Sequence, residues 1–487
     1  MQSYVPNFLK KRACLTPNRP AIYIDERVVT FYELDDTVRK WVSFFRKLGI
    51  AEKMPVAICM PNSLLLIQVI FALQYMGAIT VFINTRLTEG EKQYQLQDAN
   101  VQFFLIGAEE KMVRMENIHT FILTNETLPE NIQPDFHEMI EFGINDVATI
   151  MYTSGTTGKP KGVMQTYGNH LYSALNGVLN MGLHENDRWL VQLPIFHVSG
   201  FSTLIKSMVY GMSIVLTEQK SMQSILETIQ KQKVTLLSFV AKNIQDIFDL
   251  RAEHFLKDVR GILLGGGPVS DTLLEKCKEA DLPIYLTYGM TETASQVATI
   301  DGCDIYRKMG SVGKPLFFNQ IRILGTETSN TVGEILIKGP TVMKGYLHQF
   351  EETHARMTTD GFFHTGDLGY LDEEGYLYIM ARCSDLIISG GENIYPAEIE
   401  MRMMALMWFT EVAVVGHKDE KWGEVPVAFY VKKPDVEITE EEIKRRLQTH
   451  LAKYKLPKMY YAVSELPRNA LGKVEKNQLK KWLEHKE

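Results

Sequence analysis

The sequence predicts an α/β protein: a large domain of doubly wound sheets with a small antiparallel sheet or β-barrel, then a smaller α+β domain. The chain of 487 residues is too long for one hydrophobic core. Strand-like apolar runs alternate with helical patterns up to about Thr287, as in a doubly wound sheet. Short strands follow from about Gly310, and mixed strands and helices follow from Arg382. We therefore expect domains at residues 1–383 and 384–487.

The elements predicted for the N-terminal domain begin with a hairpin and an amphipathic helix that ends at Gly49, a typical C-cap position. In chain order they are the strands Ala21–Ile24 and Val28–Thr30, the helices Phe31–Leu48 and Leu87–Asp98, the strand Val101–Ile106, the helix Tyr167–Leu179, the strand Arg188–Leu193, an apolar helix from Phe201, the strand Ser213–Leu216, the helix Ser221–Lys231, and the strands Thr235–Phe239, Gly261–Leu264 and Ile284–Thr287. The stretch from about Ile118 to Asn145 has little periodicity and is interpreted as a loose connection.

One stretch, Met54–Thr85, contains no charged residue and is long enough to cross a membrane. Pro61 interrupts it, and Gln68 and Gln74 lie within it. We interpret it instead as a βαβ unit of a buried parallel sheet, whose strands are apolar on both faces. Its expected elements are the strand Pro55–Met60, the helix Ser63–Met76 and the strand Ala78–Ile83.

The elements predicted beyond Gly310 fall into two groups. The small sheet or barrel comprises the strands Gln320–Leu324, Gly333–Lys338, Leu368–Leu371 and Tyr376–Met380, the last two joined by the turn sequence Asp372–Gly375. The C-terminal domain comprises the strands Val412–Val415, Val425–Val431 and Tyr460–Val463 and the helices Thr439–Leu451 and Lys476–Glu484.

Composition and charge exclude several classes of protein. A hydrophobic content of 45% and a charged content of 23% are those of an ordinary soluble globular protein. The net charge of -7 offers no basic field to attract nucleic acid. The N-terminal residues 1–12 lack the apolar core of a signal peptide. The cysteines form no Cys-x-x-Cys pair and indicate reduced thiols in a cytoplasmic protein; they are Cys14, Cys59, Cys277, Cys303 and Cys383.

A loop rich in glycine and hydroxyl residues, Tyr152–Val163, follows the predicted strand Val147–Met151. Its glycines let successive backbone N–H groups wrap an anion, and its hydroxyls and a lysine add donors to phosphate oxygens. It is not a Walker A loop, because Lys159 is followed by Pro160. The alternative is a flexible linker, but linkers rarely have a strand before them. The candidate phosphate-binding residues are Thr153, Ser154, Gly155, Thr156, Thr157 and Lys161.

Two more segments that could bind a ligand follow predicted strands. The glycines 265–267 leave the backbone bare, so a flat base could lie against it, although a tight βα turn explains them equally well. Tyr288 could stack on adenine, and Glu292 could hold Mg²⁺, which usually takes one or two protein carboxylates. For Glu292 the alternative is a carboxylate stabilised by a helix N-terminus. The candidate nucleotide-binding residues are Gly265, Gly266, Gly267, Tyr288, Gly289 and Thr291.

Two further motifs lie closer to the C-terminus. Thr365-Gly366-Asp367 offers a carboxylate of the kind that holds a ribose diol, while His364 is expected to be a packing neighbour. Pro467 and Gly472 bracket a loop that ends in Lys473, for which an ordinary surface lysine is the alternative interpretation.

These motifs occur in the order found in the adenylate-forming superfamily, which includes acyl-CoA synthetases, luciferases and peptide-synthetase adenylation domains. The chain resembles that superfamily from Tyr152 to Lys473. The resemblance implies ATP and Mg²⁺ as cofactors, an acyl-AMP intermediate and a mobile C-terminal domain. It assigns the metal to Thr153 and Glu292 and makes Lys473 catalytic.

The resemblance also implies roles around the domain boundary. It makes Asp367 the ribose partner, and it places Arg382 near ribose or phosphate. It makes position 384 the hinge between the domains, where many relatives carry Asp or Lys. Ser384 departs from that pattern, but a hinge needs torsional freedom more than a particular side chain.

The chain is expected to end after the lysine motif without a carrier domain, so coenzyme A is the leading thiol acceptor. Among acid–CoA ligases the chain most resembles the o-succinylbenzoate–CoA ligases of menaquinone biosynthesis, through its compact length and the segment His197–Lys206. The alternatives are a benzoate-type or medium-chain acyl-CoA ligase, an adenylation module that loads a carrier protein, and a non-catalytic nucleotide-binding protein. The expected partners are small molecules, and a homo-oligomer is left open.

The segment around the predicted helix from Phe201 carries the candidate acyl-site residues. The resemblance places His197 at the wall of the acyl pocket, where it is a candidate for both catalysis and substrate binding. Lys206 could pair with the carboxylate that a dicarboxylic acid leaves unreacted, and Ser199 and Ser202 could add hydrogen bonds. The alternative for Lys206 is that its stem packs while its ammonium reaches water.

Overall fold

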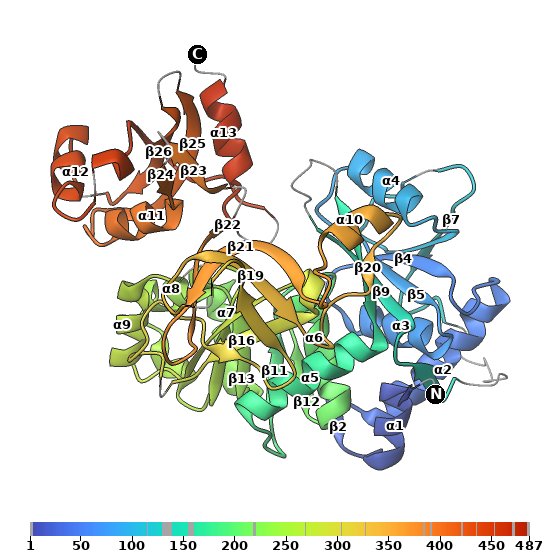
Figure 1. Cartoon of the computed structure of the whole chain (residues 1–487). Coiled ribbons are helices and arrows are strands. Elements are labelled where there is room, and N and C mark those ends of the chain that lie inside the picture. The colour runs from blue at the N-terminus through green and yellow to red at the C-terminus, as the bar shows by residue number, and fades with distance from the viewer. Residues whose placement is uncertain are drawn as a thin grey trace.

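The computed structural model describes residues 3–484, apart from 114, 129–138, 154–159, 218–220, 268, 303, 327, 383–384, 390–391, 420–421, 435, 452 and 470–472. The described chain forms a large N-terminal part that ends with Arg382 and a smaller part from Asp385 onward. The smaller part lies at the upper left of Figure 1, beyond the end of the large part.

The first large sheet contains the βαβ unit predicted for the uncharged stretch. Its seven strands, in spatial order, are β20 (Gly345–Tyr346), β10 (Lys161–Thr166), β9 (Val147–Thr153), β5 (Ile79–Phe82), β4 (Pro55–Cys59), β6 (Phe103–Gly107) and β7 (His119–Leu123). The strands from β9 to β7 are parallel, while β10 and β20 are antiparallel to their neighbours. The helices α3 (Leu64–Tyr75) and α4 (Glu89–Asp98) complete the crossovers.

The second large sheet has nine strands and a parallel centre. In spatial order they are β17 (Lys314–Pro315), β16 (Ser295–Ile300), β15 (Ile284–Met290), β14 (Gly261–Leu264), β13 (Leu236–Phe239), β11 (Arg188–Val191), β12 (Ser213–Leu216), β2 (Pro20–Ile24) and β3 (Arg27–Thr30). Its outer face packs against the helices α7 (Met222–Lys231), α8 (Ala241–Asp249), η1 (Glu253–Leu256) and α9 (Asp271–Glu279).

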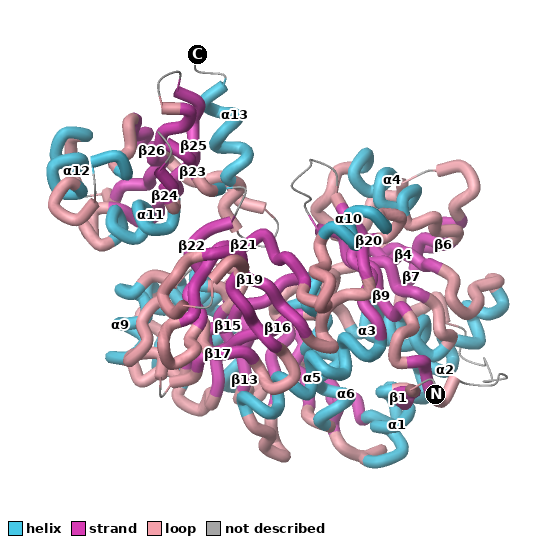
Figure 2. Tube along the Cα trace, in the orientation of Figure 1, coloured by secondary structure: helices cyan, strands magenta, loops and turns pink. Residues whose placement is uncertain are grey.

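The main hydrophobic core lies between these two sheets. It joins side chains of the first sheet, such as Val56 and Met151, to side chains of the second, such as Trp189 and Leu236. Helices lie between the two sheets and contribute side chains to this core (Figure 2). These helices are α1 (Phe8–Leu15), α2 (Phe31–Lys47), α3, α5 (Tyr167–Met181) and α6 (Val198–Tyr210).

A four-stranded antiparallel sheet follows, with the order β18 (Gln320–Ile323), β19 (Gly333–Lys338), β21 (Phe363–Leu371) and β22 (Leu377–Arg382). Its core includes Ile335 and Leu377 and continues into Val297 of β16. The far side of β22 is also paired: Tyr378 forms an isolated antiparallel bridge with Ser311, and Leu377 exchanges backbone hydrogen bonds with Val312 and Gly313. The predicted small antiparallel sheet is therefore observed. Between β20 and β21 lies the short helix α10 (Phe350–Ala355).

The C-terminal part is an α+β domain with its own core on each face of a five-stranded sheet. The sheet has the order β24 (Glu392–Ile394), β23 (Ile387–Ser389), β26 (Gly423–Lys432) and β25 (Phe409–Asp419), and β27 (Met459–Ala462) pairs with β26. One face packs against α11 (Pro396–Met404) and α12 (Glu440–Leu447), and the other packs against α13 (Lys476–Glu484), as Figure 1 also shows.

Several predicted elements need correction. The stretch interpreted as a loose connection contains β7, and it contains β8 (Glu141–Gly143), which pairs with β1 (Tyr4–Pro6). These strands are short or half exposed, so they lack an apolar pattern. Helix α6 begins at Val198, three residues before the predicted start, and β15 continues to Met290. In the described part of the chain, none of the helices combines the length and apolar character that a membrane crossing needs.

Candidate active site

The predicted phosphate loop leaves the sheet where β9 ends. Thr153 is the last residue of β9, and Lys161, the first residue of β10, is its direct partner across the two strands. The loop therefore starts at the carboxyl end of a parallel strand, as predicted. Ser154, Gly155, Thr156 and Thr157 lie outside the described residues.

Lys161 is held at the base of this loop. Its Nζ lies 2.7 Å from Glu352 Oε1 on α10, and only 8% of its side chain is exposed. Its ammonium also lies 5.3 Å from the centre of the Tyr346 ring. Arg356 contacts the same oxygen of Glu352 at 3.2 Å. A phosphate contact by Lys161 remains a prediction, and it would require Lys161 to share its charge with Glu352.

Glu292 lies at the carboxyl end of β15, in the single 3₁₀ turn η2 (Thr291–Thr293). Tyr346 donates its hydroxyl proton to Glu292 Oε1 at 3.0 Å, and the Glu292 backbone oxygen accepts from Met343 N at 2.8 Å. Burial and the neighbouring Glu292 carboxylate raise the pKa of Tyr346, so its hydroxyl stays a donor. The residue expected to reach a metal is therefore fixed by two hydrogen bonds.

The donor set around Glu292 fits Mg²⁺ better than a metal with an all-protein cage. Among the described residues there is no group of three His, Cys, Asp or Glu side chains that could enclose a metal. Mg²⁺ is usually held by one or two carboxylates together with substrate phosphates. Glu292 and the hydroxyl of Thr153, at the end of β9, are the two predicted ligands, and together they would form a donor set of that kind.

Tyr288 and Asp367 meet, although 79 positions separate them. Tyr288 donates its hydroxyl proton to Asp367 Oδ2 at 2.7 Å, and Asp367 is buried. Asp367 N also donates to Thr365 Oγ1 at 3.0 Å. Arg382 is the direct strand partner of Asp367, so the predicted ribose partner is adjacent to the residue predicted to lie near ribose or phosphate. The Arg382 side chain lies outside the described residues.

The turn before Asp367 is stabilised by a carboxylate that the sequence analysis did not predict. Glu334 on β19 accepts from Gly366 N at 2.9 Å, and its other oxygen lies 2.8 Å from His364 Nδ1. His364 is therefore a bracing neighbour, as expected. Glu334 gave no signal because it lies outside every motif, and only the pairing of β19 with β21 brings it there.

The glycines of the site have a steric reason as well as a possible binding one. Gly266 has a φ of +83°, which a tight turn after β14 requires. A Cβ on Gly289 would lie 1.8 Å from the Ser295 oxygen, at the point where the pairing of β15 with its neighbour β16 shifts register. The backbone geometry therefore accounts for Gly266 and Gly289 without a ligand, whereas a Cβ on Gly267 would meet nothing within 4 Å. Base binding by Gly265, Gly266, Gly267 and Thr291 remains a prediction.

His197 precedes α6 and is the N-cap residue of that helix. Its Nε2 is buried and has no hydrogen-bond partner among the described residues. Burial, with a smaller contribution from Arg86, lowers the pKa of His197 to about 4, so the ring is neutral at pH 7. Within the helix, Ser202 donates to the Ser199 oxygen at 3.1 Å. A buried, unpaired nitrogen at the start of α6 is available to a ligand.

Lys206 is fully enclosed, with 1% of its surface exposed. Its Nζ donates to Gln296 Oε1 on β16 at 2.7 Å and lies 4.7 Å from the centre of the Trp189 ring. Burial lowers the pKa of Lys206 to about 7. The alternative that its ammonium reaches water is therefore wrong. Gly177 of α5 makes room for it, since a Cβ there would lie 3.1 Å from Lys206 Cε.

Lys473 lies on the C-terminal domain in a loop closed by Asn469. Asn469 N donates to the Lys473 oxygen at 2.8 Å, and Asn469 Oδ1 accepts from Lys473 N at 3.0 Å. Arg468 anchors the start of the loop through an ion pair with Glu411 of β25 at 2.8 Å. Arg468, Asn469 and Lys473 are thus held to one another and to the domain sheet, while residues 470–472 and the predicted hinge at Ser384 lie outside the described residues.

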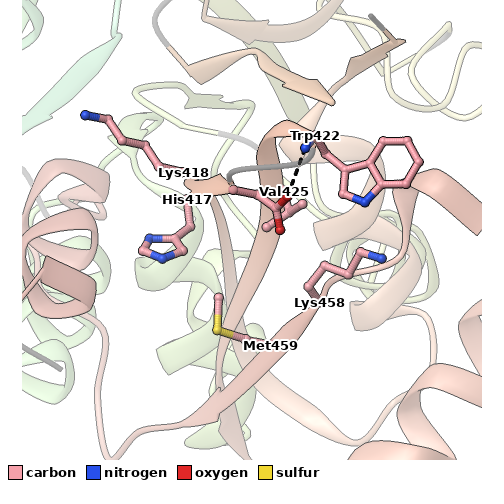
Figure 3. A pocket seen from close by; sticks show the side chains of 7 residues that line it. His417, Lys418, Trp422, Val425, Lys458 and Met459 are labelled. Atoms are coloured by element: carbon pink, nitrogen blue, oxygen red, sulfur yellow. Dashed lines mark hydrogen bonds between the residues drawn. The ribbon is translucent and has the colours of Figure 1, made fainter. Parts of the chain in front are cut away.

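The C-terminal domain also contains an open pocket of about 560 Å³ at the ends of β25 and β26. Figure 3 shows the Lys458 side chain extending beside the Trp422 ring, with His417 and Met459 on the other side. Lys418 belongs to the same lining, and Asp419 Oδ1 accepts from Trp422 N at 2.9 Å. The lining combines positive charge with an aromatic face, which suits a phosphorylated and aromatic ligand.

Comparisons with known proteins match nearly the whole chain. The family model described as AMP-binding enzyme matches residues 9–347, and the model described as AMP-binding enzyme C-terminal domain matches residues 398–473. A 2-succinylbenzoate–CoA ligase of Geobacillus sp. (strain WCH70) is 46% identical over 100% of this chain and 99% of its own length.

Two solved structures of an o-succinylbenzoate-CoA synthetase from Bacillus subtilis are also similar. One is a complex with the acyl-adenylate intermediate: it is 39% identical, covers 98% of each chain and has a TM-score of 0.92. The other is a complex with ATP and a magnesium ion: it is 39% identical, covers 98% of this chain and 100% of its own, and also has a TM-score of 0.92.

Proposed function

The chain belongs to the AMP-binding enzyme family, and from that premise we propose that it converts 2-succinylbenzoate, ATP and CoA into 2-succinylbenzoyl-CoA, AMP and diphosphate. It is an AMP-forming acid–thiol ligase that uses ATP and Mg²⁺. The observation that carries the substrate assignment is similarity over the full length, in sequence and in structure, to ligases of this acid.

In the first half-reaction the acid attacks the α-phosphate of ATP. Its carboxylate has an ordinary pKa of about 4, so it is ionised at neutral pH and needs no general base. The barrier lies in bringing two anions together and in the charge that develops on the departing diphosphate. Thr153 and Glu292 would hold Mg²⁺, which supplies charge neutralisation when bound. The fixed carboxylate of Glu292 supports this assignment.

The nucleotide end of the site is supported by the contacts around Asp367. We assign its carboxylate to the ribose hydroxyls and Tyr288 to the adenine ring. The Tyr288 hydroxyl, which donates to Asp367, keeps that carboxylate oriented. Lys473 is assigned to the developing charge at the α-phosphate, and Asn469 closes the loop that presents it.

We assign Lys206 to the carboxylate of 2-succinylbenzoate that does not react. A buried ammonium with one hydrogen-bond acceptor, Gln296, retains donors for a second acceptor. An incoming carboxylate would favour the protonated form of Lys206, so a charged pair would form in a dry site. His197, neutral and with an unpaired nitrogen, is assigned to the wall of the same pocket, with Ser199 and Ser202 near the start of the helix.

In the second half-reaction CoA attacks the carbonyl of the acyl-adenylate through its thiol, and AMP departs. We assign the pocket between Trp422 and Lys458 to the phosphorylated, adenine-bearing end of CoA, because its lysines and indole match that chemistry. Rotation of the C-terminal domain about Ser384 would move Lys473 away from the large part and bring this pocket to the large part in its place. A cytoplasmic location agrees with the absence of a cysteine pairing framework and with these substrates.

The test supplies purified protein with the acid, ATP, Mg²⁺ and CoA, and follows AMP, diphosphate and the thioester by mass spectrometry. We expect equal amounts of AMP and thioester, and acyl-adenylate with diphosphate when CoA is omitted. Parallel reactions use benzoate, a medium-chain fatty acid and a purified acyl carrier protein. Faster turnover of either other acid would overturn the substrate assignment, and thioester on the carrier but not on CoA would overturn the ligase class.

A further inference from the structure

Tyr346 lies between two parts of the adenylation site that no sequence motif connects. It belongs to β20, where it pairs with Val163 of β10, the strand that follows the phosphate loop. Its hydroxyl donates to Glu292 Oε1 at 3.0 Å, and its ring lies 5.3 Å from Lys161 Nζ. Only 5% of its surface is exposed.

The strand that carries Tyr346 is itself firmly held. Tyr346 N donates to Thr353 Oγ1 at 2.9 Å, and Met343 N, three residues earlier, donates to the Glu292 backbone oxygen at 2.8 Å. Glu352, one residue before Thr353, holds Lys161. The segment 343–353 therefore contacts Glu292 through both its backbone and its side chain, and it also contacts the base of the phosphate loop.

We propose that Tyr346 is a positioning residue for adenylation: its hydroxyl fixes the Glu292 carboxylate in the orientation that binds Mg²⁺. This inference rests on the proposed function, because it assumes that Glu292 is a metal ligand. Groups that hydrogen-bond a metal ligand restrict its rotation and so lower the cost of ordering it when the metal binds. A glutamate on a single 3₁₀ turn has little helix around it to supply that restriction.

The alternative is that Tyr346 only packs the core, where Val163, Met343 and Phe363 surround it. Replacing Tyr346 by phenylalanine separates the two roles, since the ring and its packing stay while the donor is lost. A matched control is Tyr75→Phe. Tyr75 is also buried and donates its hydroxyl proton to a carboxylate, that of Asp35, away from the candidate site.

The experiment measures binding of Mn²⁺, as a substitute for Mg²⁺, from the electron paramagnetic resonance signal of the free ion. It uses the full chain with a non-hydrolysable ATP analogue. We expect Tyr346→Phe to bind Mn²⁺ about tenfold more weakly than the unchanged protein, as is typical for loss of a group that orients a metal ligand. We expect Tyr75→Phe to bind Mn²⁺ normally. The concentration of Mg²⁺ needed for half-maximal diphosphate exchange should rise by a similar factor in Tyr346→Phe.

A double-mutant cycle with Glu292→Gln tests the inference even if the Tyr346→Phe protein is less stable than the unchanged protein. Once the carboxylate is absent, loss of the hydroxyl should weaken Mn²⁺ binding no further. Mn²⁺ affinity of Tyr346→Phe within twofold of the unchanged protein, or an equal loss in both backgrounds of the cycle, would overturn the inference and leave the proposed function standing. Failure of the unchanged protein to bind Mn²⁺ with the analogue would overturn the metal assignment itself.

Discussion

Replacing Lys206 by methionine should make the ligand-free protein more stable while it weakens binding of the acid. Burial lowers the pKa of Lys206 from 10.5 to about 7, which corresponds to roughly 5 kcal/mol against the protonated form. Methionine removes that penalty. It leaves Gln296 Oε1 without its donor, at about 1–3 kcal/mol, and loses about 1 kcal/mol of attraction to the Trp189 ring. The expected net gain in the free energy of unfolding is about 1–3 kcal/mol.

The gain in the free energy of unfolding should become smaller as the pH rises above 7. The unfolded chain binds this proton near pH 10.5 and the folded chain near pH 7, so between these values the unfolded state holds more protons. The stability of the unchanged protein therefore rises with pH in that window, and the advantage of methionine shrinks. It should be constant below pH 7 and should fall by about 2 kcal/mol or more between pH 6 and pH 9.

Urea unfolding of the large part at pH 6 and pH 9 measures this difference. Lys92→Met is the matched control, and we expect it to lower the free energy of unfolding. Lys92 is also buried, but its Nζ pairs with Glu110 at 3.0 Å. Its removal leaves a buried carboxylate unpaired, which should destabilise the protein. Equal or lower stability of Lys206→Met at pH 6, without dependence on pH, would refute the reasoning.

The same variant tests the substrate assignment. If Lys206 pairs with the spare carboxylate, its loss should cost roughly 2–3 kcal/mol of binding, or tens-fold in KM for 2-succinylbenzoate. The KM for ATP should stay nearly the same. An unaltered KM for the acid, or an equal rise for a monocarboxylic analogue, would contradict the pairing.

Three further outcomes are expected. Lys473→Ala should slow adenylate formation by about a hundredfold and still convert supplied acyl-adenylate to thioester, and equal loss in both half-reactions would contradict its assignment. Ser384→Pro should spare only one half-reaction, because proline fixes φ at the proposed hinge, and unchanged rates in both would place the hinge elsewhere. Tyr288→Phe should raise the KM for ATP two- to tenfold, since loss of one hydrogen bond to Asp367 costs about 0.5–1.5 kcal/mol, while the KM for the acid stays the same.

Hydrophobic patterns within short segments of the sequence predicted much of the fold. Gly261–Leu264, Gly333–Lys338 and Lys476–Glu484 have the predicted bounds, because apolar runs between turn residues determine them locally. The apolar pattern predicts a helix only from Phe201, because Ser199 and Gly200 are typical loop residues, whereas α6 begins at Val198. In the structure Gly200 packs within 2.3 Å, measured from an ideal Cβ, of the Pro194 oxygen, a close approach that only glycine allows.

The contacts that give the site its chemistry were less predictable. The burial of Lys206 depends on Gln296, 90 positions away, and no local pattern connects the two. Tyr346 lies in a strand of two residues, too short to give a periodic signal. Sequence motifs therefore identified the residues that are expected to face the ligands, while the contacts that orient those residues depend on strand pairing.

The hydrophobic clusters of the described chain stop at the domain boundary. Those of the C-terminal domain draw only on residues from Ile387 onward, and the others end by Ile379. Cores that share no residue across the boundary predict two folding units, so heat or denaturant should melt the two parts in separable steps. A core substitution in one unit should leave the melting of the other unchanged. The two units are also candidates for separate expression and reassembly in trans, with Lys473 supplied on its own polypeptide.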